Sequence, residues 1–155
     1  ADHGETSALV RAKAEQALDH DLAVMICVGE TLAERTAGQA EQVVIDQLRA
    51  SMPHDVPSGR VLIAYEPVWA IGTGEVASLD DIGAMHAAIA SELPARQNGT
   101  GAPPIPVLYG GSVNADNAAA IFAVPHVAGG LVGGASLDAV AFDAICSAAA
   151  AASSG

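Results

Sequence analysis

The segment Ala-Tyr-Glu-Pro-Val-Trp-Ala-Ile-Gly-Thr-Gly occupies residues 64–74 and continues an apolar run that begins at Val61. The run 61–65 has the length and aliphatic content of a buried strand, and Pro67 forces the chain out of it. Glu66 therefore stands at the carboxyl end of a strand, where parallel α/β folds place their active sites. The small apolar residues and glycines after it are typical of a lid. A single Glu at a strand end is usually a solvated surface residue. The functional role predicted for Glu66 therefore depends on the whole segment 64–74 and not on Glu66 alone.

Three more apolar runs of strand length lie along the chain, at residues 23–28, 105–109 and 127–132. None of the four runs alternates polar and apolar residues, which is typical of parallel strands covered on both faces. Apolar residues at helical spacing and polar cap residues predict helices around these strands. The predicted helices are one opened by Thr6 or Ser7, one over residues 38–51, one opened by Ser78 and Asp81, one capped by Asn114 and one opened by Asp138.

This alternation of helices and strands predicts an α/β fold with about four β/α units and parallel strands, right-handed at each crossover. Four strands cannot close a barrel of ordinary size, which has eight β/α units in about 250 residues. The pattern is therefore either half a barrel or a small open sheet. The polar stretch 97–104 is expected to be a surface loop, so residues 1–155 form one domain with no second domain. The chain opens in mid-pattern, without a leading strand, which suggests a fragment.

The charge balance is strongly acidic, with 6 basic and 18 acidic residues and a net charge of −12. This balance argues against a nucleic-acid binder, but a small phosphate can still be bound locally by backbone N–H groups. No stretch of about 18 apolar residues lacks a glycine or a charge, so no membrane span is expected, and the first residues do not indicate secretion. Neither Cys27 nor Cys146 belongs to a Cys-x-x-Cys motif, so both are predicted to be buried, reduced thiols.

Two glycine turns follow the last two predicted strands. One is Tyr109-Gly110-Gly111-Ser112-Val113-Asn114, and the other lies in Leu131-Val132-Gly133-Gly134-Ala135-Ser136-Leu137. Glycine lets the backbone approach a ligand closely, and the exposed N–H groups of a helix start attract anions. Either turn alone is more often a plain turn. Their place after successive strands favours one shared phosphate pocket.

Together these segments resemble the triosephosphate isomerase family. The resemblance also includes Ile26-Cys27-Val28-Gly29-Glu30-Thr31-Leu32 and residues 35–39, and it covers essentially the whole chain. It implies the C-terminal half of a (β/α)8 barrel, with strands five to eight. It also implies an intramolecular aldose-ketose isomerase that interconverts dihydroxyacetone phosphate and D-glyceraldehyde 3-phosphate through an enediolate.

The resemblance assigns roles to single residues. Glu66 matches the base that takes a proton from one substrate carbon and returns it to the next. Residues 67–77 match a lid that closes over the substrate, which Tyr109 and Ser112 latch shut. The implied lid and latch residues are Pro67, Val68, Trp69, Ala70, Ile71, Thr73, Gly74, Tyr109 and Glu30, the last as a partner of Trp69, and the implied phosphate-binding residues are Gly72, Ser112, Gly133 and Gly134.

The resemblance also sets the wider expectations. The family needs no metal or cofactor, is cytoplasmic, and serves glycolysis and gluconeogenesis. Its substrate is a small phosphorylated triose, with no nucleic acid or membrane involved. The parent enzyme is expected to be a homodimer.

The chain departs from the family at several points. The family's electrophilic Lys and His lie in segments that this sequence lacks. The histidines of this chain do not lie in a segment that matches the one around the family's catalytic His, and they are expected to be surface or helix residues. Ala90 and Ala128 stand where the family usually has an Arg and an Asp that can pair, and Glu75 replaces a common lid-hinge Lys. The histidines are His3, His20, His54, His86 and His126.

A half barrel exposes strand edges and the face that would line the barrel. The isolated chain is therefore expected to be poorly soluble, to self-associate or to need the N-terminal half. Because it lacks the electrophilic Lys and His, it is also expected to be inactive on its own. Two other functions remain open. One is a phosphate-binding barrel epimerase or synthase, although such barrels lack the Glu-Pro-Val-Trp lid. The other is a non-catalytic phosphate-binding remnant or complementing half-barrel.

Overall fold

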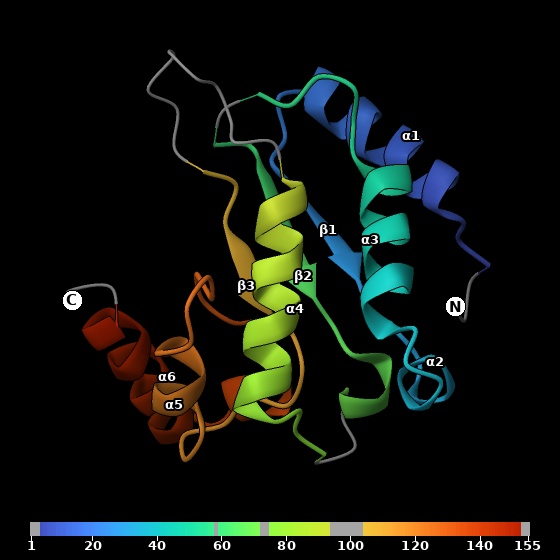
Figure 1. Cartoon of the computed structure of the whole chain (residues 1–155). Helices are drawn as coiled ribbons and strands as arrows, with labels where there is room; N and C mark the ends of the chain where they lie inside the picture. The colour runs from blue at the N-terminus through green and yellow to red at the C-terminus, as the bar shows by residue number, and fades with distance from the viewer. Residues whose placement is uncertain (1–3, 58, 72–74, 94–103, 153–155) are drawn as a thin grey trace.

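The computed structural model describes residues 4–57, 59–71, 75–93 and 104–152 (Figure 1). Helices and strands alternate along these residues, as the sequence pattern predicted. In chain order the elements are α1 (Ser7–Asp19), β1 (Val24–Val28), α2 (Leu32–Thr36), α3 (Ala40–Ser51), β2 (Val61–Tyr65), the 3-10 turn η1 (Val68–Ala70), α4 (Leu79–Glu92), β3 (Val107–Tyr109), α5 (Ala118–Phe122), the 3-10 turn η2 (Gly134–Leu137) and α6 (Ala139–Ala152).

The three strands form one parallel sheet in the order β1-β2-β3. Val28 pairs with Tyr65, and Tyr65 pairs with Tyr109, so the carboxyl ends of the strands are level with one another. The parallel α/β arrangement predicted from the sequence is confirmed. Because the ends are level, the residues that follow the strands gather at a single edge of the sheet.

The fourth predicted strand, over residues 127–132, is reduced to a single bridge between Tyr109 and Gly130. The backbone still follows β3, since Ala128 N donates to the Val107 carbonyl at 2.8 Å and Leu131 N donates to the Tyr109 carbonyl at 2.9 Å. Gly129 has φ +153°, a conformation that favours glycine. Glycines weaken strand interiors, which explains why a regular strand does not form here.

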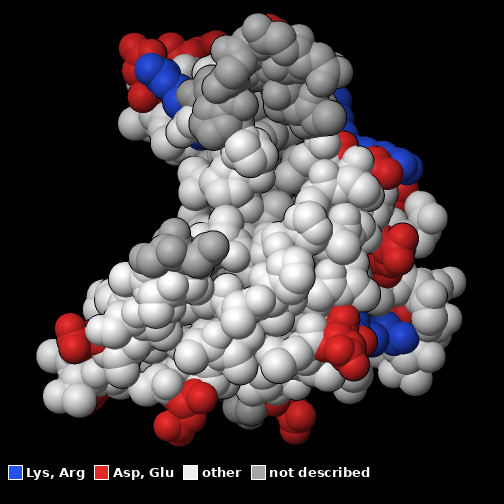
Figure 2. All heavy atoms as spheres, turned by 60° about the vertical axis from the view of Figure 1, so that its left-hand side comes forward, with Lys and Arg blue, Asp and Glu red and all other residues white. Residues whose placement is uncertain are grey.

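The two faces of the sheet differ. Helices α1, α3 and α4 lie on one side of it (Figure 1), and the strand residues that point toward them are buried. On the opposite face Met25 and Cys27 are exposed, and Leu62 and Leu108 are only half-buried. Figure 2 shows the molecule hollowed on one side, with mostly uncharged residues around the hollow. The covering of both faces that the apolar runs favoured is therefore wrong for this chain, whereas the exposed inner face expected of a half barrel is confirmed.

The predicted burial of the cysteines is wrong as well. Cys27 and Cys146 are both exposed. Cys27 lies on the uncovered face of β1, next in sequence to two residues that face the helices and are buried. Strand alternation sends neighbouring residues to opposite faces, so an apolar run does not by itself bury each of its members.

Three helix starts confirm the predicted caps. The side-chain oxygens of Thr6, Ser78 and Asp138 accept hydrogen bonds from backbone N–H groups three residues later, at 3.3, 3.1 and 2.8 Å. Asn114 behaves differently, since its side chain caps the turn that precedes α5 by accepting from the Asp116 and Asn117 N–H groups. Helix α5 therefore begins later than predicted, at Ala118.

The histidines differ in how far they are buried. His20, His54 and His126 are exposed, whereas His86 in α4 is fully buried and His3 lies outside the described residues. Within the described ranges, no helix is long and apolar enough to cross a membrane.

Candidate active site

Glu66 follows β2 directly and extends the sheet by one more bond, from its N–H to the Val28 carbonyl at 2.8 Å. Its side chain runs against Gly110, the residue after β3. A Cβ placed on Gly110 would lie 2.4 Å from Glu66 Cγ and 3.2 Å from its Cδ. The carboxylate therefore lies beside the first of the two glycine turns that the sequence singled out.

Gly29 fixes the backbone beneath Glu66. A Cβ on Gly29 would lie 1.7 Å from the Glu66 carbonyl oxygen, so no other residue fits there without moving the chain. Gln47 of α3 brackets the same glycine by accepting from its N–H at 2.8 Å and donating to its carbonyl at 3.0 Å. Sequence reasoning missed Gln47, since nothing local connects it with a turn that precedes it by 18 residues.

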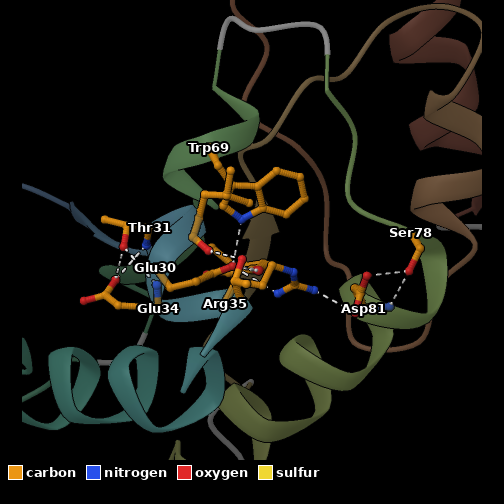
Figure 3. A network of polar contacts seen from close by, with 10 residues as sticks. Glu30, Thr31, Glu34, Arg35, Trp69, Ser78 and Asp81 are labelled. Atoms are coloured by element: carbon orange, nitrogen blue, oxygen red, sulfur yellow. Dashed lines mark hydrogen bonds and ion pairs between the residues drawn. The ribbon is translucent and has the colours of Figure 1, made fainter. Parts of the chain in front are cut away.

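Glu30 is the buried acid of the site, with 0 % of its surface exposed. Its Oε1 accepts hydrogen bonds from Trp69 Nε1 at 3.0 Å, from the Tyr65 hydroxyl at 3.2 Å and from Arg35 Nη1 at 3.0 Å. Figure 3 shows the side chains of Trp69 and Arg35 converging on the Glu30 carboxylate. The structure thus brings Glu30 and Trp69, which come from separate segments, into direct contact.

Arg35 extends this network to α4. Its Nη2 pairs with Asp81 Oδ1 at 2.7 Å, and its guanidinium carbon lies 5.3 Å from the centre of the Trp69 ring (Figure 3). Burial opposes the charge of Arg35, but the hydrogen bond to Asp81 and the surrounding negative charges outweigh it and raise its pKa. The pKa of Asp81 is lowered by the Ser78 hydroxyl and by Arg35.

Sequence reasoning did not single out the pairing of Arg35 with Asp81. A local signal for part of it was present, because Thr31 and Glu34 form a capping box at the start of α2. This box fixes the helix that carries Arg35. The partnership with Asp81 depends on tertiary packing and leaves no sequence signal.

Ser112 connects the turn after β3 with the segment after β2. Its hydroxyl donates to the Ala70 carbonyl at 2.8 Å, and Asn117 Nδ2 donates to the Ser112 carbonyl at 3.0 Å. Of the predicted lid residues, Pro67 and Ala70 are buried, whereas Val68 and Ile71 are exposed. Gly72, Thr73 and Gly74 lie outside the described residues.

Tyr109 is fully buried beside this turn. A Cβ on Gly111 would lie 2.2 Å from the Tyr109 hydroxyl oxygen, so the glycine makes room for the phenol. Burial raises the pKa of Tyr109, while the nearby Ala77 backbone acts in the opposite direction. The hydroxyl nevertheless makes no hydrogen bond of ordinary geometry within the described structure.

Gly133 and Gly134 lie at the start of η2, where a Cβ on either would meet nothing within 4 Å. The sequence predicted a helix after these glycines, with Asp138 as the residue that opens it. The structure has a short 3-10 turn there, and α6 begins only at Ala139. Leu131, two residues before these glycines, lies near the first glycine turn, since its Cδ1 is 3.4 Å from a Cβ built on Gly110.

Cys27 shares the uncovered face of the sheet with Glu66. Burial of the thiol, a hydrogen bond with Glu66 and the charge of Glu66 together raise its pKa to about 12. Because the residue as a whole is exposed, burial accounts for less of this rise in pKa, and the neighbouring Glu66 carboxylate accounts for more. The thiol is therefore held protonated next to the candidate base.

Comparison with known proteins points to one family. The model of the triosephosphate isomerase family matches residues 1–149. The chain is 55 % identical to a triosephosphate isomerase of Marinobacter nauticus over 92 % of its length, and 52 % identical to one of Acidiphilium cryptum over 97 % of its length. A crystal structure of triosephosphate isomerase from Bartonella henselae covers 94 % of the chain with a TM-score of 0.83 and 40 % identity.

The chain spans only part of these relatives. It covers 57 % of the Marinobacter nauticus protein, 62 % of the Acidiphilium cryptum protein and 59 % of the Bartonella henselae chain. The partial (β/α) barrel expected from the resemblance agrees with this likeness in structure. The chain belongs to the triosephosphate isomerase family.

Proposed function

We propose that this chain supplies the proton-transfer machinery of a triosephosphate isomerase, as the C-terminal half, with strands five to eight, of its barrel. The observation that carries the proposal is the place of Glu66, at the carboxyl end of β2 and against Gly110. Glu66 takes a proton from one carbon of dihydroxyacetone phosphate and returns it to the neighbouring carbon to give D-glyceraldehyde 3-phosphate. The carboxylate becomes a stronger base when a closed site removes water from it.

The segment that follows Glu66 forms the first part of the lid in this proposal. The bonds from Trp69 to Glu30 and from Ser112 to Ala70 support it, because they tie η1 to two different strand ends. A closed lid protects the enediolate from water, which would otherwise allow loss of its phosphate. Gly72, Ser112, Gly133 and Gly134 bind that phosphate, and Tyr109 latches the lid.

A second polypeptide half completes the site. The uncovered sheet face with Met25 and Cys27, and the free edge of β1, support this part of the proposal. The family's electrophilic Lys and His have no counterpart in these 155 residues. Without these electrophiles, isomerisation by Glu66 alone is slower by several orders of magnitude, so the chain alone is inactive. The completed enzyme is a cytoplasmic homodimer of glycolysis and gluconeogenesis and uses no cofactor.

The test is an isomerase assay on the 155-residue chain alone and mixed with the N-terminal half of a related triosephosphate isomerase. Activity is expected only in the mixture and is lost in Glu66→Gln. Glu41→Gln, an exposed carboxylate on α3, is the matched control and keeps the activity. A mixture whose activity survives Glu66→Gln contradicts the proposal.

The alternative function is a phosphate-binding half-barrel without turnover. The missing electrophiles favour it for the isolated chain. It predicts that the chain binds inorganic phosphate near its glycine turns, and that neither the chain nor the mixture isomerises triose phosphates. Substitution of Glu66 would then leave phosphate binding unchanged.

A further inference from the structure

We propose that Arg35 is a positioning residue for the candidate site, holding Trp69 and the first turn of α4 in a fixed relation to each other. The inference rests on the proposed function in so far as Glu66 is the base, since η1 with Trp69 directly follows Glu66. It adds a residue from α2 that touches neither Glu66 nor the glycine turns in any contact described above.

The geometry joins three parts of the chain through one guanidinium (Figure 3). Nη1 donates to Glu30 Oε1 at 3.0 Å, in the turn after β1. Nη2 pairs with Asp81 Oδ1 at 2.7 Å, in the first turn of α4. The guanidinium also lies over the Trp69 ring at 5.3 Å, in η1. An arginine suits this position because its planar fork can bond two carboxylates while its face stacks on an aromatic ring.

Both ends of the connection are firmly anchored. Glu30 bonds η1 twice, since its carbonyl accepts from Val68 N at 3.0 Å and its carboxylate accepts from Trp69 Nε1. Asp81 is fixed through Ser78, whose hydroxyl donates to Asp81 Oδ2 at 2.7 Å. A loss of Arg35 therefore frees η1 and the start of α4 to move independently.

Burial makes Arg35 hard to replace. Its side chain is 19 % exposed, and the carboxylate of Glu30 is 0 % exposed. Among the described residues the Oε2 atom of Glu30 has no hydrogen-bond partner, and the side-chain bonds described above all converge on Oε1. Without Arg35 the carboxylate keeps the Tyr65 hydroxyl and the Trp69 indole as its donors among the described residues, and it loses the positive charge of the guanidinium. Trp69 would then lose both the ring stack and the fixed orientation of its acceptor.

Trp69 is the single tryptophan of the chain, so its fluorescence reports directly on the proposed role. Emission wavelength and acrylamide quenching are measured for the 155-residue chain and for Arg35→Met, Arg35→Lys and Asp81→Asn. Arg35→Met is expected to shift the emission to longer wavelength and to increase quenching. Arg35→Lys restores the charge but not the stacked fork, so it corrects this change only in part. Asp81→Asn changes the signal in the same direction and by less.

The matched control is Arg60→Met, which removes an exposed ion pair with Asp21 at 2.8 Å, at the amino end of β2. It should leave Trp69 fluorescence unchanged. A folded Arg35→Met chain with the emission and quenching of the parent overturns the proposal. If Arg35→Met does not fold by circular dichroism, the other two variants decide: a parent-like signal in both overturns it as well.

A second measurement separates this inference from the proposed function. In the mixture with the N-terminal half, Arg35→Met is expected to lower kcat by up to about 100-fold, with a smaller change in KM, because a misplaced site slows the chemical step. If the parent mixture shows no activity, the proposed function fails while the fluorescence result still tests the positioning role. If kcat is unchanged although Trp69 moves, Arg35 is structural only and the proposal is wrong.

Discussion

The Ser112 hydroxyl donates a 2.8 Å hydrogen bond to the carbonyl of Ala70, and so joins the turn after β3 to the segment after β2. The two residues are 42 positions apart in the sequence. Both segments leave the same edge of the sheet, beside Glu66. This bond is therefore a direct link between the candidate lid and the candidate phosphate site.

Ser112→Ala removes this link. The expected loss is about 1 kcal/mol in the free energy of unfolding, the usual net value of one hydrogen bond. The measurement is urea unfolding followed by circular dichroism. Ser136→Ala is the control, because its hydroxyl donates to the nearby Gly133 carbonyl at 2.7 Å within one exposed turn. The control should change stability by less than about 0.5 kcal/mol, and equal losses in both variants would count against a linking role for Ser112.

Gly110→Ala tests the contact with Glu66. The new methyl would lie 2.4 Å from Glu66 Cγ, so the carboxylate must move away from its place after β2. Activity of the mixture with the N-terminal half is expected to fall by up to about 100-fold. Gly83→Ala in α4 is the control, because its methyl meets Val124 at an ordinary 3.4 Å and alanine favours helix. Full activity in Gly110→Ala would mean that the base acts from another position.

His86 makes the stability of the chain depend on pH. Burial lowers its pKa from 6.5 to about 4, and its ring packs against Tyr65 and Tyr109. Its Nδ1 contacts the His126 carbonyl at 3.2 Å, while Nε2 has no hydrogen-bond partner among the described residues. Between these pKa values the unfolded chain binds the extra proton, so stability falls as the pH drops from about 6.5 to about 4. The expected total is on the order of 3 kcal/mol.

The measurement is urea unfolding at several pH values between 4 and 7, on the parent and on His86→Phe. The variant keeps an aromatic ring and removes the titration, so its stability should depend less steeply on pH in this window. His54→Gln, at an exposed position, should keep the parent profile. Identical profiles for the parent and His86→Phe would show that another group is responsible.

Cys27 should report on the charge of Glu66. With its pKa raised to about 12, the thiol is almost wholly protonated at pH 8 and should react slowly with iodoacetamide. Glu66→Gln removes the neighbouring charge, so the pH at which Cys27 reacts should move down. Alkylation rates against pH are measured in a Cys146→Ser background, with Glu41→Gln as control. A profile that does not change in Glu66→Gln would show that burial alone raises the pKa.

Much of the fold could be predicted from local sequence. The strands β1 and β2 follow from short aliphatic runs, and the caps Thr6, Ser78 and Asp138 mark their helices because capping bonds span only a few residues. The place of Glu66 beside Gly110 follows from the level ends of neighbouring parallel strands.

The rest depends on packing between distant segments. Arg35 meets Asp81, and Gln47 meets Gly29, only after the helices have settled on the sheet. The exposure of Cys27 does not follow from the apolar pattern of β1, because it depends on whether anything covers that face, as the expected half barrel leaves it uncovered. The prediction of a fourth regular strand was wrong at Gly129 and Gly130, because an apolar pattern does not reveal the conformational freedom of glycine.

The tight fit of Gly29 under the Glu66 carbonyl limits any redesign of this chain. Gln47 bonds both the N–H and the carbonyl of this glycine, so the turn that packs against the main chain at the end of β2 is itself held in place. A shorter acid at position 66 would pull the carboxylate back by one methylene, and the strand could not follow to make up the difference. A different distance between the carboxylate at position 66 and a bound molecule would therefore have to come from a change in the side chain or in the ligand, and not from a shift of the main chain.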